Sequence, residues 1–179
     1  MAELTYYVAS TVDHFIAGPN GEADASLFFY EGDHVSDFLS FIQKCAGVLM
    51  GSNTYEFGFQ FGLSPGEPSY KGVKHYIFSS SLSFESNDDV QLISGNAIDY
   101  VKELKANTEG TLWLCGGGGL AGSLLDAGLL DKLILKVNPI IIQQGIPLFG
   151  ASERKIKLTL LDLKHYQNGI ILPTYKIDY

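Results

Sequence analysis

A run of four glycines, Gly116–Gly119, is the feature of this sequence that points most directly to chemistry. It follows an apolar stretch typical of a strand, Thr111–Cys115, and precedes leucines spaced as on one face of a helix. A strand that turns through glycines into a helix leaves unpaired N–H groups at the helix start, which favour an anion such as phosphate. The run has neither the Walker A Gly-Lys-Ser/Thr nor the Rossmann glycine spacing. The alternative is a tight strand–helix turn that binds nothing.

Two other groups of polar residues could contact a ligand. Asp33 and Asp37 lie one turn apart at the start of an expected helix, where acidic residues commonly favour the helix dipole; the functional alternative is that one of them faces a ligand. The run Ser79–Ser81 follows a strand-like segment. Its hydroxyls could bind phosphate, or the run could be a polar turn.

Metal and nucleophile chemistry are not indicated. The four histidines and two cysteines have no metal-ligand spacing, so we expect no metal. The sequence also lacks the Gly-x-Ser-x-Gly motif of a nucleophile elbow.

Composition limits the class of protein and its partners. The chain has 179 residues, of which 46% are hydrophobic and 18% charged, which predicts one globular domain over residues 1–179. The net charge of −8 and the single arginine, Arg154, argue against nucleic acid or an anionic membrane as partner. Cys45 and Cys115 lie in apolar surroundings, and neither a signal peptide nor an apolar run of 18 residues is present. We therefore expect a cytoplasmic protein whose phosphate ligands are held by backbone N–H groups, hydroxyls and lysines.

Strand-like and helix-like segments alternate along the chain and must position these residues. We expect strands at 4–10, 48–50, 76–78, 90–93 and 133–137, and helices at 35–42 and 97–104. Val35, Phe38, Leu39 and Ile42 would form the buried face of the first helix, while Ser52 would cap a short helix. Residues 58–72 have no clear period and are expected to be a loop.

The end of the chain carries a hairpin signal. Asn168-Gly169 separates two alternating segments, 156–166 and 170–179. Together these patterns predict an α/β fold with three layers, α/β/α, and a mostly parallel central sheet that ends in a C-terminal antiparallel hairpin.

Three segments, in this order, resemble the dihydrofolate-reductase-like superfamily, in particular the C-terminal reductase domain of the riboflavin-biosynthesis deaminase–reductase. Residues 9–21 are similar to the motif S-x-D-G-x-I-A, and residues 49–56 to M-G-R-x-T-Y-E. Residues 115–120, 128–135 and 139–149 are similar to G-G-x-x-L, G-L-x-D-E-L-x-L and P-x-x-x-G-x-G-x-P-L-F. The resemblance covers most of the chain and implies a dihydrofolate-reductase-like fold.

The resemblance also implies a nicotinamide dinucleotide across the carboxyl ends of the strands. It assigns the pyrophosphate to two helix starts, the nicotinamide to the end of the first loop, and the adenosine ribose with its 2′-phosphate to a serine pair. The implied cofactor-binding residues are Ile16, Ala17, Gly51, Ser52, Asn53, Thr54, Ser79, Ser80, Gly116, Gly117, Gly118, Gly119 and Leu120. Asp37 falls where dihydrofolate reductases carry their active-site acid, and we expect a pocket lined from Phe38, Phe41 and the first loop to raise its pKa.

The sequence departs from the family pattern at several positions. Ser52 replaces the arginine of M-G-R-x-T, which leaves the preference between NADPH and NADH open. His14 and Gln143 stand where the motifs have glycine. Val73 lies near the position of the arginine that grips folate, and the tryptophan after the first loop is missing, so folate is not the expected substrate.

These resemblances imply an NAD(P)H-dependent reductase similar to 5-amino-6-(5-phosphoribosylamino)uracil reductase, with Asp37 as catalytic acid and NADPH as cofactor, NADH being possible. We expect a small polar substrate and a homodimer. The alternative is a non-catalytic nucleotide-binding or ligand-sensing protein that kept the fold.

Overall fold

The computed structural model of the protein describes all 179 residues and is built on an eight-stranded sheet. Its spatial order is β5-β4-β3-β6-β1-β7-β10-β9, with parallel pairing from β5 through β7 and antiparallel pairing of β10 with both β7 and β9. A small second sheet pairs β2 with β8. The strands are β1 (Glu3–Ser10), β2 (Phe15–Ala17), β3 (Cys45–Gly51), β4 (His75–Phe78), β5 (Val90–Ile93), β6 (Thr111–Gly116), β7 (Lys132–Val137), β8 (Ile146–Pro147), β9 (Lys157–His165) and β10 (Ile171–Asp178).

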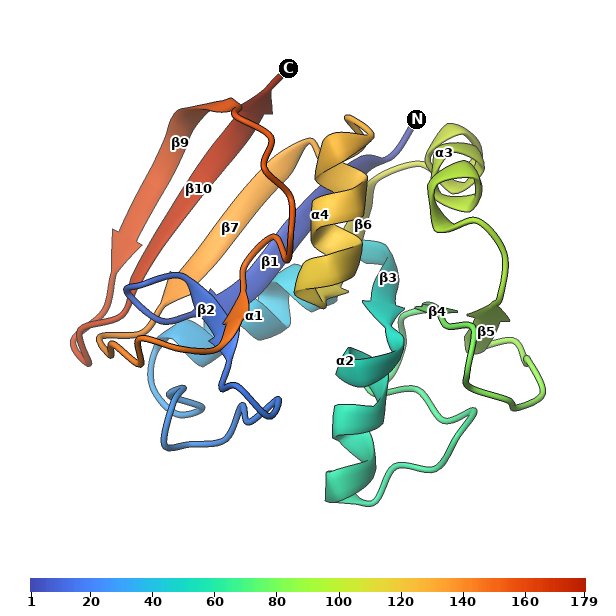
Figure 1. Cartoon of the computed structure of the whole chain (residues 1–179), viewed down its shortest axis with the longest axis horizontal. Helices are drawn as coiled ribbons and strands as arrows, with labels where there is room; N and C mark the ends of the chain where they lie inside the picture. Colours follow the sequence, from blue (N-terminus) through green and yellow to red (C-terminus); the bar gives the residue numbers. More distant parts are fainter.

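Helices cover both faces of this sheet, so the predicted three-layer α/β/α architecture is confirmed. Helix α4 lies in front of the sheet in Figure 1 and α1 lies behind it. The helices are α1 (His34–Ile42), α2 (Ser52–Glu56), α3 (Ala97–Asn107) and α4 (Gly118–Asp126), and α2 runs on into a 3₁₀ turn, η1 (Phe57–Phe61). None of these helices has the length and apolar character that crossing a membrane requires.

Each face of the sheet has its own hydrophobic core, because side chains alternate along the strands. Leu4 and Tyr6 of β1 belong to the core that includes Leu124 of α4. Tyr7 belongs to the core on the other face, with Trp113 of β6. We call these two sides of the sheet the α4 face and the α1 face.

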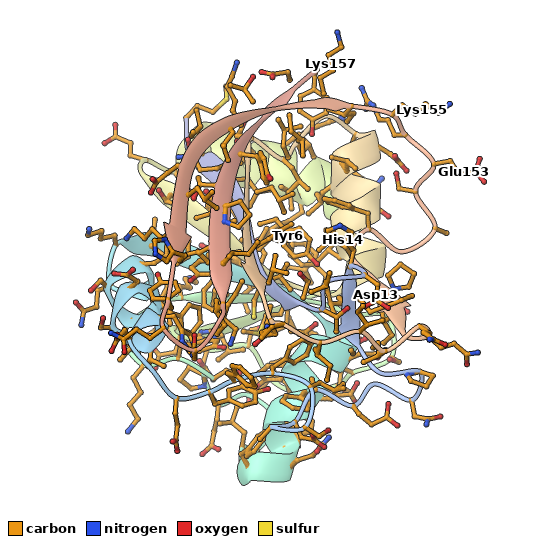
Figure 2. The ribbon with its side chains drawn as sticks, turned by 90° about the vertical axis from the view of Figure 1, so that its left-hand side faces the viewer. Tyr6, Asp13, His14, Glu153, Lys155 and Lys157 are labelled. Atoms are coloured by element: carbon orange, nitrogen blue, oxygen red, sulfur yellow. The ribbon has the colours of Figure 1, made fainter.

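The C-terminal hairpin forms as its sequence predicts. Gly169 has a φ of +85°, which glycine adopts without strain, and the chain turns there between β9 and β10. Figure 2 shows β9 nearest the viewer, with α1 to one side of the hairpin and α4 to the other. The hairpin therefore forms one end of the sheet, where β9 is paired on one side only.

The buried side of the first helix differs from the expected one. Leu39 is 53% exposed, whereas His34 and Ile42 are buried and Phe38 and Phe41 pack against the α1-face core. Phe41 contacts Tyr7 and Trp113 edge-on, so tertiary packing turns the helix toward its aromatic residues. The expected loop at 58–72 also begins inside the η1 turn.

Candidate functional site

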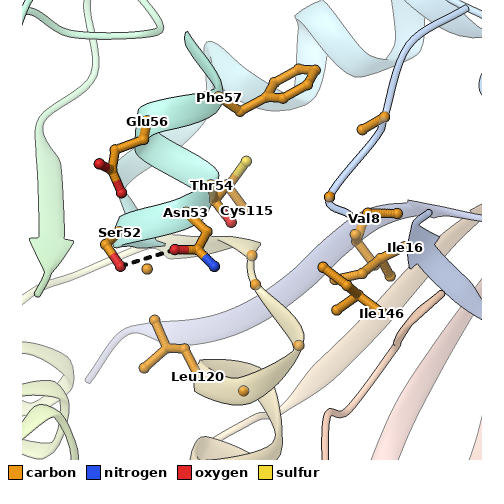
Figure 3. Close-up of a pocket in the computed structure, with 18 of the residues that line it drawn as sticks. Val8, Ile16, Ser52, Asn53, Thr54, Glu56, Phe57, Cys115, Leu120 and Ile146 are labelled. Carbon is orange, nitrogen blue, oxygen red and sulfur yellow. Dashed lines mark hydrogen bonds between the residues drawn. The ribbon is translucent and has the colours of Figure 1, made fainter. Parts of the chain in front are cut away.

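A cleft of about 620 Å³ opens between the first turns of α2 and α4. In Figure 3, Ser52 and Asn53 of α2 lie across the cleft from Leu120 of α4, and Val8, Ile16 and Ile146 stand together at the other end. The cleft therefore has two helix starts at one end and an apolar wall at the other. It lies at the carboxyl ends of β3 and β6, where open α/β sheets commonly bind ligands.

The glycines of the β6–α4 turn allow neighbouring segments to pack closely and leave open space in the cleft. A Cβ on Gly118 would lie 2.3 Å from the carbonyl oxygen of Pro147, so this glycine lets α4 pack against the end of β8. A Cβ on Gly116 or Gly117 would lie 3.1 or 3.3 Å from Oγ1 of Thr54 on the neighbouring α2. A Cβ on Gly119 would meet no atom within 4 Å, and this exposed residue lines the cleft.

The start of α4 presents unpaired donors to the cleft. The first intrahelical bond runs from the N–H of Ala121 to the carbonyl oxygen of Gly117, at 3.0 Å. The N–H groups of Gly118, Gly119 and Leu120 precede it, so they have no intrahelical acceptor. These donors and the positive end of the helix dipole favour an anion at this position.

Helix α2 presents its polar residues from the opposite side of the cleft. Tyr55 is buried, and its hydroxyl donates to the carbonyl oxygen of Glu67 at 2.8 Å and accepts from the N–H of Gly66 at 2.9 Å. These bonds fasten α2 to the following loop and leave Ser52 and Asn53 at the cleft.

The expected helix cap is wrong. Gly51 occupies the N-cap position with extended backbone, and no side chain caps the helix. Ser52 is instead the first helical residue, and its hydroxyl donates one long hydrogen bond, to Oδ1 of Asn53 at 3.5 Å. Its hydroxyl is therefore available to a ligand in the cleft.

The opposite end of the cleft is apolar because three strands meet there. Val8 comes from β1, Ile16 from β2 and Ile146 from β8, which pairs with β2. Such a wall suits the face of a flat ring and excludes water beside it.

The cleft contains almost no charge. No Lys, Arg or His lines it, and Glu56 is its only carboxylate. Burial raises the pKa of Cys115 to about 12, so its thiol stays protonated at neutral pH and is not a thiolate nucleophile. The only strong anion-binding groups in the cleft are therefore backbone N–H groups and side-chain hydroxyls and amides.

The structure brings together all but two of the expected cofactor-binding residues. Ile16 and Ala17 of β2 line the cleft, as do all the expected residues of the β3–α2 and β6–α4 junctions, whereas Ser79 and Ser80 do not. The hydroxyl of Ser79 accepts from the N–H groups of Ser81 at 3.1 Å and Leu82 at 2.9 Å. These serines form the polar turn that the sequence left as an alternative, and their role toward an adenosine ribose stays a prediction.

Asp37 does not line the cleft, and the expected rise of its pKa is wrong. Its Oδ2 accepts from the hydroxyl of Tyr166 at 2.6 Å and from Nζ of Lys164 at 3.0 Å. These two partners hold the pKa of the Asp37 carboxyl below its usual range. The expected apolar pocket is missing because Phe38 and Phe41 turn toward the core, so Asp37 is an ionised link between α1 and the hairpin.

Several residues that line the cleft were not predicted from the sequence. Glu56 lies in segment 49–56, and Asn20 and Gly21 lie in segment 9–21. Both segments resemble family motifs, but these three residues were given no role. Phe57 and Gln60 lie outside these segments. They reach the cleft only because α2 continues into η1. The residues that were missed are Val8, Asn20, Gly21, Ala23, Glu56, Phe57, Gln60, Cys115 and Ile146.

The aspartate of the first motif positions the loops rather than lining the cleft. The carboxylate of Asp13, labelled in Figure 2 beside His14, accepts from the N–H groups of Gln143 at 2.8 Å and Ile142 at 3.2 Å. His14 and Gln143 have φ of 64° and 66°, and they are the only non-glycine residues with positive φ. Both stand where the family motifs have glycine, the residue that adopts positive φ without strain.

Sequence comparison matches almost the whole chain to one protein family. The model of the RibD C-terminal domain matches residues 2–172. The uncharacterised protein YyaP of Bacillus subtilis (strain 168) is 26% identical over 176 residues, which cover 94% of this chain and 91% of YyaP.

Solved structures share the fold. A protein from Shewanella sp. PV-4 described as a riboflavin biosynthesis protein superposes with a TM-score of 0.82 at 22% identity, with full coverage of both chains. A deaminase/5-amino-6-(5-phosphoribosylamino)uracil reductase from Thermotoga maritima gives 0.71 at 13% identity, covering 99% of this chain and 57% of that one. Dihydrofolate reductase from Enterococcus faecalis, in complex with NADP(H), gives 0.67 at 15%, covering 99% and 97%. With nearly its whole length matched by the family model and a dihydrofolate-reductase-like fold, the chain belongs to the RibD C-terminal domain family.

Proposed function

We propose that the protein is an NAD(P)H-dependent reductase that passes a hydride to a small, polar substrate. The observation that carries this proposal is the pair of helix starts that face each other across the cleft, with an apolar wall beyond them. Membership of the RibD C-terminal domain family and the fold shared with a reductase complexed with NADP(H) support it.

The residues present fit the phosphates of a dinucleotide. The N–H groups of Gly118, Gly119 and Leu120 have no intrahelical acceptor and provide a set of donors at the positive end of α4. Gly119 leaves open space where a side chain would stand, so a phosphate can approach the backbone closely. On the other side, Ser52 and Asn53 would donate from their side chains.

The apolar wall would receive the nicotinamide. Val8, Ile16 and Ile146 would lie against the ring and exclude water from the place where the reaction occurs. The bound cofactor would supply the hydride, while the protein mainly holds the two reactants in position. The amides of Asn20 and Gln60 line the same cleft and would offer hydrogen bonds to a polar substrate.

The substrate class that we propose is a pyrimidine carrying a ribityl or phosphoribosyl chain. The support comes from the family match and from the fold shared with a deaminase/5-amino-6-(5-phosphoribosylamino)uracil reductase. The cofactor would be NADPH, or NADH, since no cationic side chain lines the cleft.

A second candidate is a non-catalytic nucleotide-binding protein. The observation that favours it is the lack of any Lys, Arg or His in the cleft, together with Ser52 at the position of the family arginine. Loss of charged phosphate contacts would lower affinity for the cofactor, although it would leave the backbone donors in place.

An assay of cofactor oxidation separates the two. The protein is mixed with NADPH or NADH and with 5-amino-6-(5-phosphoribosylamino)uracil, or with simple aldehydes, ketones and imines, and the absorbance of the reduced nicotinamide is followed. The reductase proposal expects substrate-dependent oxidation that is lost in a folded Gly119→Val variant. Dinucleotide binding without oxidation of the cofactor by any of these compounds would favour the second candidate.

A further inference from the structure

A buried asparagine joins three separate segments beside the cleft. Asn138 directly follows β7 and is completely buried. Its side-chain nitrogen donates to the carbonyl oxygens of Ser10 at 3.1 Å and Lys136 at 3.0 Å, and its Oδ1 accepts from the N–H of Phe29 at 2.9 Å. Both hydrogens and the oxygen of this amide are therefore used, which a buried amide requires. The three partners come from the end of β1, the end of β7 and the loop before α1.

Two of these segments lead to the apolar wall of the cleft. After Asn138 the chain continues from β7 to β8, which carries Ile146, while β1 continues to β2, which carries Ile16. The N–H of Val12 donates to the carbonyl oxygen of Ile140 at 2.9 Å, so the two connections are also bonded to each other. Strands β2 and β8 then pair, and Figure 3 shows their two isoleucines side by side. The position of the wall thus depends on where the two connections leave the sheet.

The third segment borders the same cleft. The peptide of Phe29 is held from both sides, its N–H by Asn138 and its carbonyl oxygen by Nζ of Lys136 at 2.6 Å. The hydroxyl of the next residue, Tyr30, donates to the carbonyl oxygen of Ala23, which lines the cleft. Asn138 therefore also fixes the loop that closes this side of the cleft.

We infer that Asn138 is a positioning residue that holds the nicotinamide end of the cleft in place, an inference that rests on the proposed function. Asn138 does not line the cleft, so it acts through the three segments that it joins. The donors proposed for the pyrophosphate belong to α2 and α4, and Asn138 forms no hydrogen bond with either helix. Loss of its amide should therefore displace the apolar wall and leave the phosphate end unchanged.

The test compares the binding of two ligands to the purified full chain by calorimetry. One is NADPH, and the other is 2′-phospho-ADP-ribose, which keeps the adenosine and pyrophosphate groups but has no nicotinamide. Asn138→Asp keeps the size of the side chain and its acceptor for Phe29, but it turns an oxygen toward the carbonyl oxygens of Ser10 and Lys136. Its affinity for NADPH should fall at least about fivefold, while its affinity for 2′-phospho-ADP-ribose should stay within about twofold of wild type.

The matched control is Asp131→Asn, the reverse exchange at the other end of β7. The carboxylate of Asp131 accepts from the N–H of Leu4 at 2.7 Å and forms an ion pair with Lys105. This site lies where β7 begins, at the edge of the sheet opposite the cleft. Asp131→Asn should therefore leave the affinity for both ligands unchanged, even where it lowers stability.

Two results of the titration overturn the inference. Unchanged NADPH affinity in a folded Asn138→Asp variant would make Asn138 a structural residue only. An equal loss of affinity for both ligands would place its effect on the whole cleft rather than on the nicotinamide end. If circular dichroism shows Asn138→Asp to be unfolded, Asn138→Ser takes its place, because it removes the same bonds without adding a charge.

Hydrogen exchange of the free protein tests the same residue without a ligand. Residues 11–17 and 139–146 should exchange faster in the Asn138 variant than in wild type or Asp131→Asn, and unchanged exchange would overturn the inference. Wild-type protein that binds neither ligand would contradict the proposed function, and the exchange rates would then decide the role of Asn138 by themselves.

Discussion

At the scale of single residues, Ser52 is the departure that most affects the proposed cofactor. It lines the cleft at the first position of α2, and no cationic side chain accompanies it. Ser52→Arg would place a guanidinium where it can pair with phosphate oxygens, so NADPH should bind about tenfold tighter, with a smaller gain for NADH. Fluorescence titration with both cofactors measures the two gains. Equal gains, or none, would show that position 52 does not face the phosphates that distinguish NADPH from NADH.

His14 and Gln143 stand where the family motifs have glycine, in a backbone conformation that glycine adopts more easily. Both have positive φ, a conformation in which an L-residue is strained by about 1 kcal/mol or more. His14 is exposed, so its imidazole adds little packing.

We therefore predict that His14→Gly is more stable than His14→Ala by about 1 kcal/mol, because both lose the imidazole and only glycine relieves the strain. Urea denaturation of the two variants provides the comparison. Equal stability would mean that this loop relaxes away from positive φ in solution.

The surroundings of Asp37 could not be predicted from the sequence. Its partners, Lys164 and Tyr166, lie well over one hundred residues away along the chain, and only the closed hairpin brings them to α1. Local sequence patterns predict the helix that carries Asp37, but they give no information about its contacts with Lys164 and Tyr166. Its assignment as the catalytic acid stays a prediction, while its ion pair provides a structural role.

For Asp37→Asn we expect a loss of stability of about 1 kcal/mol or less, since the ion pair is partly exposed, with unchanged NADPH affinity. The pKa of Asp37 is lowered on folding, so its contribution is present above the ordinary pKa of about 4 and is lost as the pH falls through the lowered value. The stability difference between variant and wild type should therefore shrink in acid. Measuring stability at several pH values checks this, and a roughly hundredfold loss of turnover would instead support the catalytic assignment.

At the scale of elements, the neighbouring glycines 118 and 119 have different roles. A Cβ on Gly118 would collide with the carbonyl oxygen of Pro147, whereas a Cβ on Gly119 would stand in open space. Gly118→Ala should therefore destabilise the protein by about 1–3 kcal/mol, while Gly119→Ala should be neutral or slightly stabilising. Thermal denaturation of the two variants measures the difference. A fully stable Gly118→Ala variant would mean that α4 does not pack tightly against the end of β8.

The elements themselves were largely predictable, because hydrophobic period and turn residues are local properties. The glycine turn into α4 and the Asn168-Gly169 hairpin both formed where their sequences indicate. The buried side of α1 was not predictable, since Phe41 rather than Leu39 finds aromatic partners in the sheet. The η1 turn was missed for a similar reason, as Phe57–Phe61 simply continues α2 without a period of its own.

At the scale of the whole molecule, the candidate site forms because a parallel sheet gathers the ends of distant strands at one edge. Gly51 ends β3 and Gly116 ends β6, and the two strands are neighbours, so two helix starts that are far apart in sequence face the same cleft. Resemblance to the family identified most of this cleft. Part of the apolar wall was not predicted. Val8 and Ile146 lie in strands, next to apolar residues that do not indicate a ligand site.

The most direct test of this account is a titration of the wild-type protein and a Gly119→Val variant with NADPH, followed by isothermal calorimetry. Gly119 faces open space in the cleft, so valine should leave the fold intact, as circular dichroism can verify, while its side chain obstructs the approach of a phosphate to the start of α4. Saturable one-site binding to wild type, with affinity reduced at least about tenfold in Gly119→Val, is the predicted result. Equal affinity of the two folded proteins would contradict the account, as would a wild-type protein that binds neither NADPH nor NADH.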